Sequence, residues 1–262
     1  MKSNGYKKYL QQQRTTKYLI ILAQLLILIF LIILWQFLAN HNLINTFITS
    51  SPKQILDTII NLYKTNDLFN HIWITTYETI ISFLLGTIIG IIIAIILWYN
   101  KFISKVVEPY LTILNSLPKV SLGPILIIWI GANIKSIIIM ALLISVIITI
   151  ITVYNGFIST DPNKVKLLKS LNATKYQTLK YLILPNNYPT IISSLKINIS
   201  MSLIGVIMGE LLVSKQGIGY LIMYGSQVFN LNLVITGIII LMLVSYLMYL
   251  IISYLEKILI KY

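Results

Sequence analysis

Long apolar stretches alternate with short polar segments along the whole chain. Crossing the hydrocarbon core of a bilayer takes about 20 mostly apolar residues in a helix. Six segments meet that requirement, at residues 18–39, 79–98, 110–130, 134–154, 188–213 and 233–254. The third is broken by Pro118 and Pro124 and carries Lys119 between them. The pattern predicts an all-α integral membrane protein with six transmembrane helices, in which a single transmembrane domain (18–262) follows a cytoplasmic tail (1–17).

Composition supports this interpretation. The chain is 57% hydrophobic and only 10% charged, with a mean hydropathy of +0.86, which nearly excludes a soluble protein. A net charge of +13 would suggest nucleic acid in a soluble protein, but among such apolar segments it favours an anionic membrane surface. We therefore expect no nucleic-acid partner. No cysteine is present, which excludes disulfides, thiolate metal sites and thiol nucleophiles.

Basic residues are distributed unevenly between the two sides of the predicted spans. With a cytoplasmic N-terminus, fourteen of the 20 Lys and Arg residues lie in the tails and loops on the inner side, and four lie outside. The positive-inside rule then places both termini in the cytoplasm. We expect a multi-pass protein of the cell membrane. Outside, Ser51 and Pro52 start a predicted helix that lies on the membrane surface.

The cytoplasmic segment 161–185 carries helix-boundary signals at regular intervals. Asp161 followed by Pro162 is a typical helix start, because the carboxylate accepts backbone N–H groups and proline's missing donor costs nothing there. Asn172 suits the left-handed conformation just beyond a helix end. A Thr-x-x-Gln capping box at Thr174 then predicts a second short helix. The segment should form two short helices joined at a bend.

An apolar stripe runs along the first of these helices. Val165, Leu168 and Leu171 recur at three-residue spacing, with Leu167 beside them, opposite several lysines. The stripe either docks on a partner or packs against its own membrane domain, and periodicity alone leaves both open. The second helix is expected to end at Pro185.

The same segment resembles the E-A-A-x3-G-x9-I-x-L-P coupling loop of ABC importer permeases. The spacing fits without a gap, with Asn172 at the glycine position, Leu182 at the isoleucine position and Leu184-Pro185 at the end. The E-A-A triplet reads Lys166-Leu167-Leu168 here. The resemblance assigns nine residues to contact with an ATPase: Val165, Lys166, Leu167, Leu168, Leu171, Asn172, Ala173, Leu184 and Pro185.

The resemblance extends over residues 50–255 and is to permeases of the taurine/nitrate/sulfonate type. Short matches occur in the family's order: Ser51-Pro52, Glu108-Pro109, Leu117-Pro118, Gly123-Pro124-Ile125, Trp129-Ile130-Gly131, Gly209-Glu210 and Gly217-Ile218-Gly219-Tyr220-Leu221. It implies the type I ABC importer permease fold, two copies of the permease, two cytoplasmic ATPase subunits and an extracellular solute-binding protein. The implied solute is small: a sulfonate, taurine, nitrate, bicarbonate or a thiamine-pyrimidine precursor.

The sequence contains no G-x-x-x-x-G-K-[ST] motif and no Gly-Lys pair. The chain therefore lacks the loop that cradles ATP phosphates. We expect no cofactor in this chain, with ATP and Mg bound, and ATP hydrolysed, by the partner subunits. The chain itself is then a transport subunit and not an enzyme.

Polar residues within the spans are the candidates for a translocation pathway. Glu210, Asn198 and Ser202 lie on the fifth span, and Lys119 lies at the proline break of the third, where its charge favours an anionic solute. Three of the four have a purely structural alternative. Glu210 could be paired structurally, Lys119 could serve packing or topology, and Ser202 could bond its own backbone.

Gly217 and Gly219, between the fifth and sixth spans, are candidates for an external gate, or they form an ordinary turn. His41 and His71 have no nearby acidic cluster, so no metal site is expected, and no catalytic set is found. The remaining alternatives are an ion-coupled secondary transporter and a membrane-embedded enzyme. The first would usually need several acids near the bilayer midplane, and the second would need a catalytic constellation.

Overall fold

The computed structural model describes residues 4–260, which are all-helical with connecting turns and no strand. Elements follow one another along the chain in the order α1 (Asn4–Asn40), α2 (Thr46–Thr49), α3 (Pro52–Lys64), α4 (Asp67–Tyr99), α5 (Lys101–Ser116), η1 (Lys119–Leu122), α6 (Gly123–Ile130), α7 (Ile134–Ile158), α8 (Pro162–Ser170), α9 (Lys175–Thr178), η2 (Leu179–Ile183), α10 (Leu184–Val213), α11 (Ile218–Gln227) and α12 (Leu231–Leu259). The all-α prediction is confirmed.

Within residues 4–260, five helical segments are long and apolar enough to cross a membrane. They contain α1, α4, α7, α10 and α12. The α5 and η1–α6 arms meet at an angle of 92° and give a sixth span if they are counted together. The bend lies at Leu117, which has an extended backbone because Pro118 follows it and disfavours the helical conformation there.

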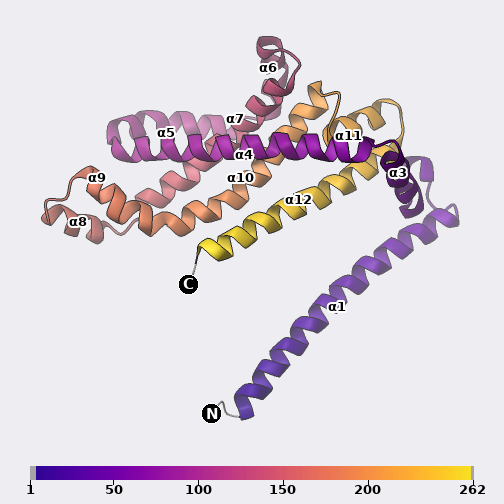
Figure 1. Ribbon diagram of the computed structural model, residues 1–262, viewed down its shortest axis with the longest axis horizontal. Helices are drawn as coiled ribbons and strands as arrows, with labels where there is room; N and C mark the ends of the chain where they lie inside the picture. The colour runs from indigo at the N-terminus through magenta and orange to yellow at the C-terminus, as the bar shows by residue number, and fades with distance from the viewer. Residues whose placement is uncertain (1–3, 261–262) are drawn as a thin grey trace.

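The core of the bundle is formed by α4, α7 and α10, which pack closely along their lengths (Figure 1). Small residues permit this approach. A side chain at Gly90 would lie 2.6 Å from Thr149 of α7, and one at Gly209 would lie 2.9 Å from the Ile137 backbone. In a membrane, where apolar burial gives little drive for helix association, such close packing is a main source of stability.

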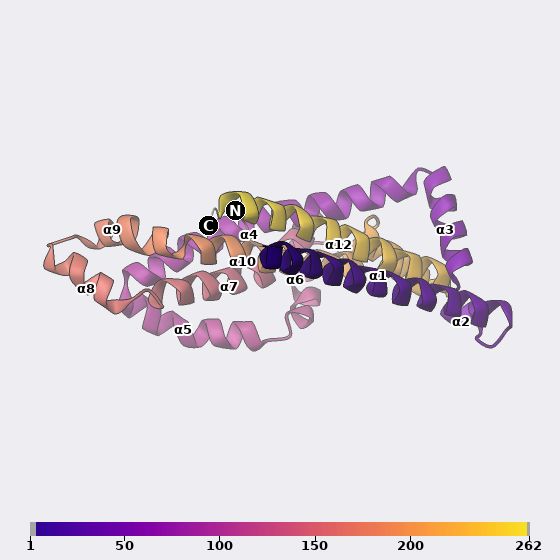
Figure 2. The ribbon, with the colours of Figure 1, turned by 90° about the horizontal axis from the view of Figure 1, so that it is seen from below.

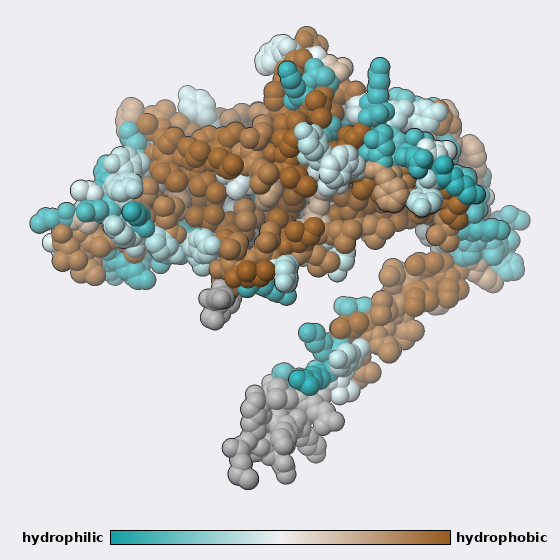
Figure 3. Space-filling model, in the orientation of Figure 1, coloured by the Kyte–Doolittle hydropathy of each residue, from teal (hydrophilic) through white to brown (hydrophobic). Residues whose placement is uncertain are grey.

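Helix α1 stands apart from this bundle along most of its length (Figure 1). None of the residues in its apolar window is buried. Figure 3 shows apolar surface along α1 and in a broad band across the bundle, with hydrophilic residues gathered at the end that carries α8 and α9 and at the end that carries α3. The band is the surface that lipid or partner chains must cover.

The ends of the bundle are built differently. At one end, α3 lies across the bundle between α2 and α4 (Figure 2). It begins as predicted, with Ser51 as N-cap accepting from the Gln54 N–H at 3.3 Å and Pro52 in the first turn. At the other end, α8 and α9 form the predicted pair of short helices.

The second short helix does not end at Pro185. Helix α9 passes through the π-helical turn η2 directly into α10, so that one helical segment runs from Lys175 to Val213. The wide turn pairs the Leu184 N–H with the Leu179 carbonyl. Pro185 then falls in the first turn of α10, where its missing N–H is tolerated.

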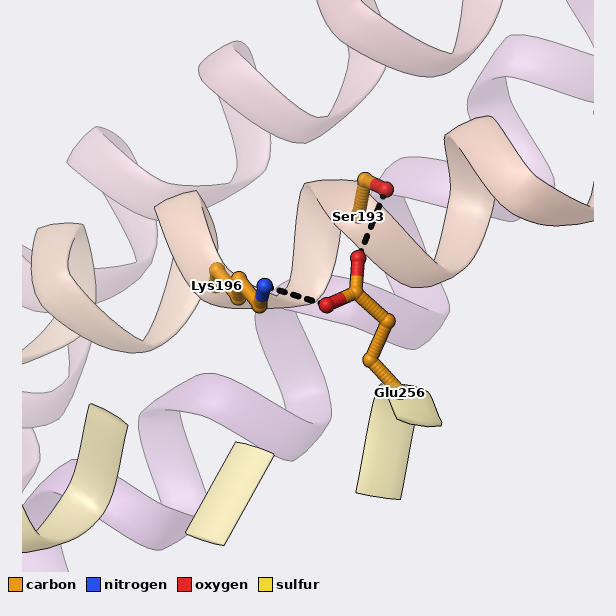
Figure 4. A network of polar contacts seen from close by, with 3 residues as sticks. All are labelled: Ser193, Lys196 and Glu256. Carbon is orange, nitrogen blue, oxygen red and sulfur yellow. Dashed lines mark hydrogen bonds and ion pairs between the residues drawn. The ribbon is translucent and has the colours of Figure 1, made fainter. Parts of the chain in front are cut away.

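A polar contact joins α10 to the C-terminal part of α12 (Figure 4). Lys196 forms an ion pair with Glu256, and the Ser193 hydroxyl donates to the same carboxylate at 2.9 Å. The two charges therefore compensate each other on the flank of the bundle.

Candidate functional site

The coupling segment is capped at each end by the residues that the sequence indicates. Asp161 accepts from the Asn163 N–H at 2.8 Å, and Thr174 forms a capping box with Gln177. Asn172 has φ +57°. Around it, the Asn172 N–H bonds the Lys169 carbonyl and the Ala173 N–H bonds the Leu168 carbonyl, both at 3.0 Å. This is a Schellman motif, and asparagine occupies the left-handed position that glycine usually takes.

The apolar stripe of α8 divides into two faces. Leu167 and Leu171 are 61% and 69% exposed. Val165 and Leu168 are half-buried, and Val165 packs against a cluster of buried side chains that includes Phe157. The packing alternative is therefore realised for Val165, whereas Leu167 and Leu171, on the other side of the helix, are left exposed and docking on a partner stays a prediction. Because the predicted ATPase contact would fall on this exposed side, we call Leu167 and Leu171 the docking leucines.

Leu184 and Pro185 have different surroundings. Leu184 packs against the same buried cluster as Val165, whereas Pro185 is exposed. Lys166 is exposed and Ala173 half-buried at the edge of a cavity beneath α8. Of the nine residues predicted to contact an ATPase, therefore, only some are exposed, and the others pack against the permease itself.

At the other end of the bundle, the Glu210 carboxylate organises a buried polar network. Its Oε1 accepts from the Thr75 hydroxyl on α4 at 2.6 Å, and its Oε2 accepts from the Gly219 N–H at 2.6 Å. The Tyr220 backbone N–H is directed at the same group. The side chain is 1% exposed. Glu210 thus holds the N-terminus of α11, whose free N–H groups favour a negative charge.

The turn before α11 is fastened to α4 by two further bonds. The Ile218 N–H donates to the Thr75 hydroxyl at 2.8 Å, and the Gly217 N–H donates to His71 Nδ1 at 2.9 Å. Gly217 has φ +105°, and a side chain there would run into the Glu210 carboxylate. A Cβ at Gly219 would lie 2.7 Å from that of Glu210. Both positions therefore need glycine because the Glu210 side chain packs directly against the backbone there. An ordinary surface turn has no such packing requirement.

Glu78 lies one turn further along α4 and extends this network. It is 2% exposed, and its carboxyl is hydrogen-bonded to that of Glu210, while its Oε2 has no other partner. No Lys or Arg takes part in the described network. Two carboxyls in contact in a dry environment do not both ionise, because the repulsion is not compensated. The pair therefore holds at least one proton.

Sequence reasoning missed His71, Thr75 and Glu78, since the second span was expected to begin at residue 79. A signal was present. The three residues follow one another at spacings of four and three, so they share one face of a helix. In the structure that face is turned inward, toward Glu210 and the Gly217 turn.

The predicted pathway residues are not brought together. Asn198 is buried and donates to Thr87 of α4 at 2.6 Å, and the Ser202 hydroxyl lies 3.4 Å from the Asn198 oxygen. Glu210 belongs to the network above. Lys119 is half-buried at the α5–α6 break, where its Nζ donates to the Asn115 carbonyl at 2.8 Å.

The comparisons with known proteins place this chain in a family. Residues 86–261 match the family described as binding-protein-dependent transport system inner membrane component. The putative aliphatic sulfonates transport permease protein of Bacillus subtilis is 28% identical over 83% of this chain and 79% of its own length. The taurine transport system permease protein of Escherichia coli is 20% identical over 87% of this chain and 84% of its own length.

Solved structures agree in fold. A bacterial ABC transporter involved in import of the acidic polysaccharide alginate superposes with a TM-score of 0.65 at 16% identity, covering 96% of this chain and 99% of that one. The inward-facing methionine ABC transporter gives a TM-score of 0.63 at 17% identity, over 73% and 95%. These similarities confirm the predicted importer permease fold. The chain belongs to the family of binding-protein-dependent transport system inner membrane components.

Proposed function

We propose that this chain is the permease subunit of an ATP-driven importer of a small solute and that it works by alternating access. Family membership supports the permease role. The observation that carries coupling to ATP is the pair of docking leucines, which stand exposed on a short helix with firm caps at both ends. A rigid projection of this kind transmits a push from a partner into α7 and α10, the helices on either side of it.

The partners follow from the same features. A cytoplasmic ATPase subunit docks on Leu167 and Leu171 and carries the ATP and Mg, which have no P-loop in this sequence. A second copy of this chain covers the apolar surface of α1 and of α6, where Ile128 and Trp129 are 80% and 78% exposed. An extracellular solute-binding protein delivers the solute to the opposite end.

The orientation rests on the distribution of basic residues. The end with α8 and α9 is cytoplasmic, since the loop 155–187 carries five lysines, and the end with α3 and α11 is extracellular. Both termini are then cytoplasmic in the cell membrane. Glu210, with Gly217 and Gly219, forms an external gate that holds the α11 turn against α4.

We infer that the solute is a small anion. Two similar proteins are named for aliphatic sulfonates and for taurine, and one from Synechococcus elongatus for nitrate import. Lys119 is the cation best placed to meet it, because it lies half-buried at the break between α5 and α6. Asn198 supports the route by joining α10 to Thr87 of α4, and Ser202 bonds Asn198 within α10. A thiamine-pyrimidine precursor is the other candidate, since a relative is named for formylaminopyrimidine transport.

The test is co-purification from native membranes in mild detergent with identification by mass spectrometry. Wild type is compared with Leu167→Asp and with Leu43→Asp, a control with similar exposure (65%) at the other end of the bundle. A P-loop ATPase should co-purify with wild type and the control and be lost with Leu167→Asp, because the new carboxylate would be desolvated in the interface.

Two results would contradict the proposal. Retention of the ATPase by Leu167→Asp would show that the docking leucines are not the contact. Absence of any ATPase from the wild-type sample would remove the importer interpretation and favour an ion-coupled secondary transporter.

A further inference from the structure

A cavity of about 600 Å³ lies beneath α8, between this helix and the cytoplasmic ends of α4, α5 and α7. Its floor is apolar, with Leu97, Phe157 and Ile183 among the residues that line it. Three aromatic side chains that are less buried than these also line it: Trp98, Tyr99 and Tyr154. The cavity therefore combines deeply buried hydrocarbon with more accessible aromatic groups that carry polar atoms.

The rim of this cavity is strongly basic. Lys101, Lys166, Lys169 and Lys175 line it, and none of the lining residues is acidic. In the described part of the chain the only ion pair joins Lys196 to Glu256, so none of these four lysines forms an ion pair with a carboxylate. Lys175 approaches the Tyr99 carbonyl at 3.5 Å and lies 5.7 Å from the centre of its ring. Four cations around one cavity repel one another, and an anion between them would relieve that repulsion.

Two observations indicate what kind of anion fits. Trp98 and Tyr99 end the long apolar helix α4, at the level where amphipathic aromatic side chains meet lipid headgroups. The docking leucines do not line the cavity, so the surface offered to the ATPase and the cavity lie on different sides of α8. An apolar floor with a lysine rim matches an amphiphile that carries a phosphate.

We propose that this cavity binds the phosphate headgroup of an anionic phospholipid from the cytoplasmic leaflet, with the lysines around the phosphate and an acyl chain against the apolar floor. Basic pockets at the cytoplasmic ends of transmembrane helices are suited to such headgroups. The lipid joins α8 to the start of α5, because Lys166 and Lys169 come from the first and Lys101 from the second. It thereby fixes the angle at which the docking leucines are presented. The site rests on the proposed orientation but not on the presence of an ATPase.

The experiment measures lipid binding to the full-length permease alone. The protein in detergent is titrated with phosphatidylglycerol or phosphatidylcholine, and bound lipid is counted by native mass spectrometry. The test variant is Lys101→Gln/Lys169→Gln, and the control is Lys164→Gln, which removes a charge from α8 outside the cavity. A lysine near an anionic headgroup is worth about a fivefold change in affinity, so the double variant should bind phosphatidylglycerol about 30-fold more weakly.

Further arms separate the alternatives. Lys101→Arg/Lys169→Arg keeps both charges and should retain binding, which shows that the loss does not come from misfolding. Equal affinity for the two lipids, or equal loss in the Lys164→Gln control, would overturn the proposal. So would displacement of the lipid by millimolar inorganic phosphate, which would assign the cavity to a free anion. Complete displacement by purified ATPase subunit would assign it to the docking interface.

Discussion

The buried carboxyl pair allows two isosteric substitutions to be predicted with different outcomes. Glu210 accepts hydrogen bonds from Thr75 and from the backbone at the start of α11, whereas Glu78 contacts Glu210 and leaves Oε2 without a partner. If Glu78 carries the shared proton, it donates and Glu210 accepts. Glu78→Gln then preserves the contact, since an amide also donates, and Glu210→Gln breaks it.

The magnitudes follow from the bonds. A hydrogen bond to a charged group is worth about 1.5–3 kcal/mol. Glutamine at position 210 keeps one acceptor but turns an NH₂ group toward either the Thr75 hydroxyl or the Gly219 N–H. It loses one charge-assisted bond and weakens the other, so we expect Glu210→Gln to destabilise the docked turn by about 3 kcal/mol. Glu78→Gln should change stability by less than about 1 kcal/mol.

The assay is hydrogen–deuterium exchange at the amides of Gly217, Ile218 and Gly219, together with thermal unfolding in detergent. Their N–H groups donate to His71, Thr75 and Glu210, respectively, and are protected only while the turn is docked. About 3 kcal/mol corresponds to roughly a 150-fold loss of protection where exchange follows local opening. Equal protection in the two variants, or a larger loss in Glu78→Gln, would refute the assignment of donor and acceptor.

Three further predictions concern single positions. Gly217→Ala should lower the melting temperature more than Gly131→Ala, because both have positive φ but only the Cβ at 217 would run into Glu210; equal shifts measured by thermal unfolding would contradict this. Asn172→Gly should retain ATPase co-purification and Asn172→Val should lose it, since a β-branched residue is poorly tolerated at φ +57°; equal recovery would show that the turn is not needed for docking. Lys119→Gln should reduce uptake of an anionic solute but not of a neutral one in a proteoliposome assay, and unchanged anion uptake would remove its proposed role.

Local structure could be predicted well from the sequence because its causes lie within a few residues. Apolar length identified the membrane-spanning segments, and the caps at Asp161 and Thr174 depend on side chains that bond backbone groups two or three positions away. The turn at Asn172 closes through backbone bonds to Lys169 and Leu168, which are also nearby in the sequence. The glycine position of the coupling motif, occupied by Asn172, is an example of such local prediction. The backbone must be in the left-handed conformation there, and asparagine adopts that conformation more readily than other non-glycine residues.

Periodicity indicated the apolar stripe of α8 but not what covers each part of it. Val165 and Leu167 differ by two positions, which places them on opposite sides of the helix, and only the packing of α8 against Phe157 and its neighbours decides which side is inside. Likewise, Pro185 predicted a helix end. The wide turn η2 instead places Pro185 in the first turn of α10, where a missing N–H is tolerated, and the helix continues.

The outer network was decided by tertiary structure alone. Thr75 and Glu210 are separated by 135 positions, and neither residue carries a local sign of the other. Glu78 falls one residue before the predicted second span, and Glu210 lies on the predicted fifth span, so the linear pattern gives no reason to pair them. Their contact arises because α4 and α10 pack closely enough for the turn at Gly217 to be enclosed between them. Residues determine which helices form and where they end, whereas the burial of a polar group depends on what the fold places opposite it.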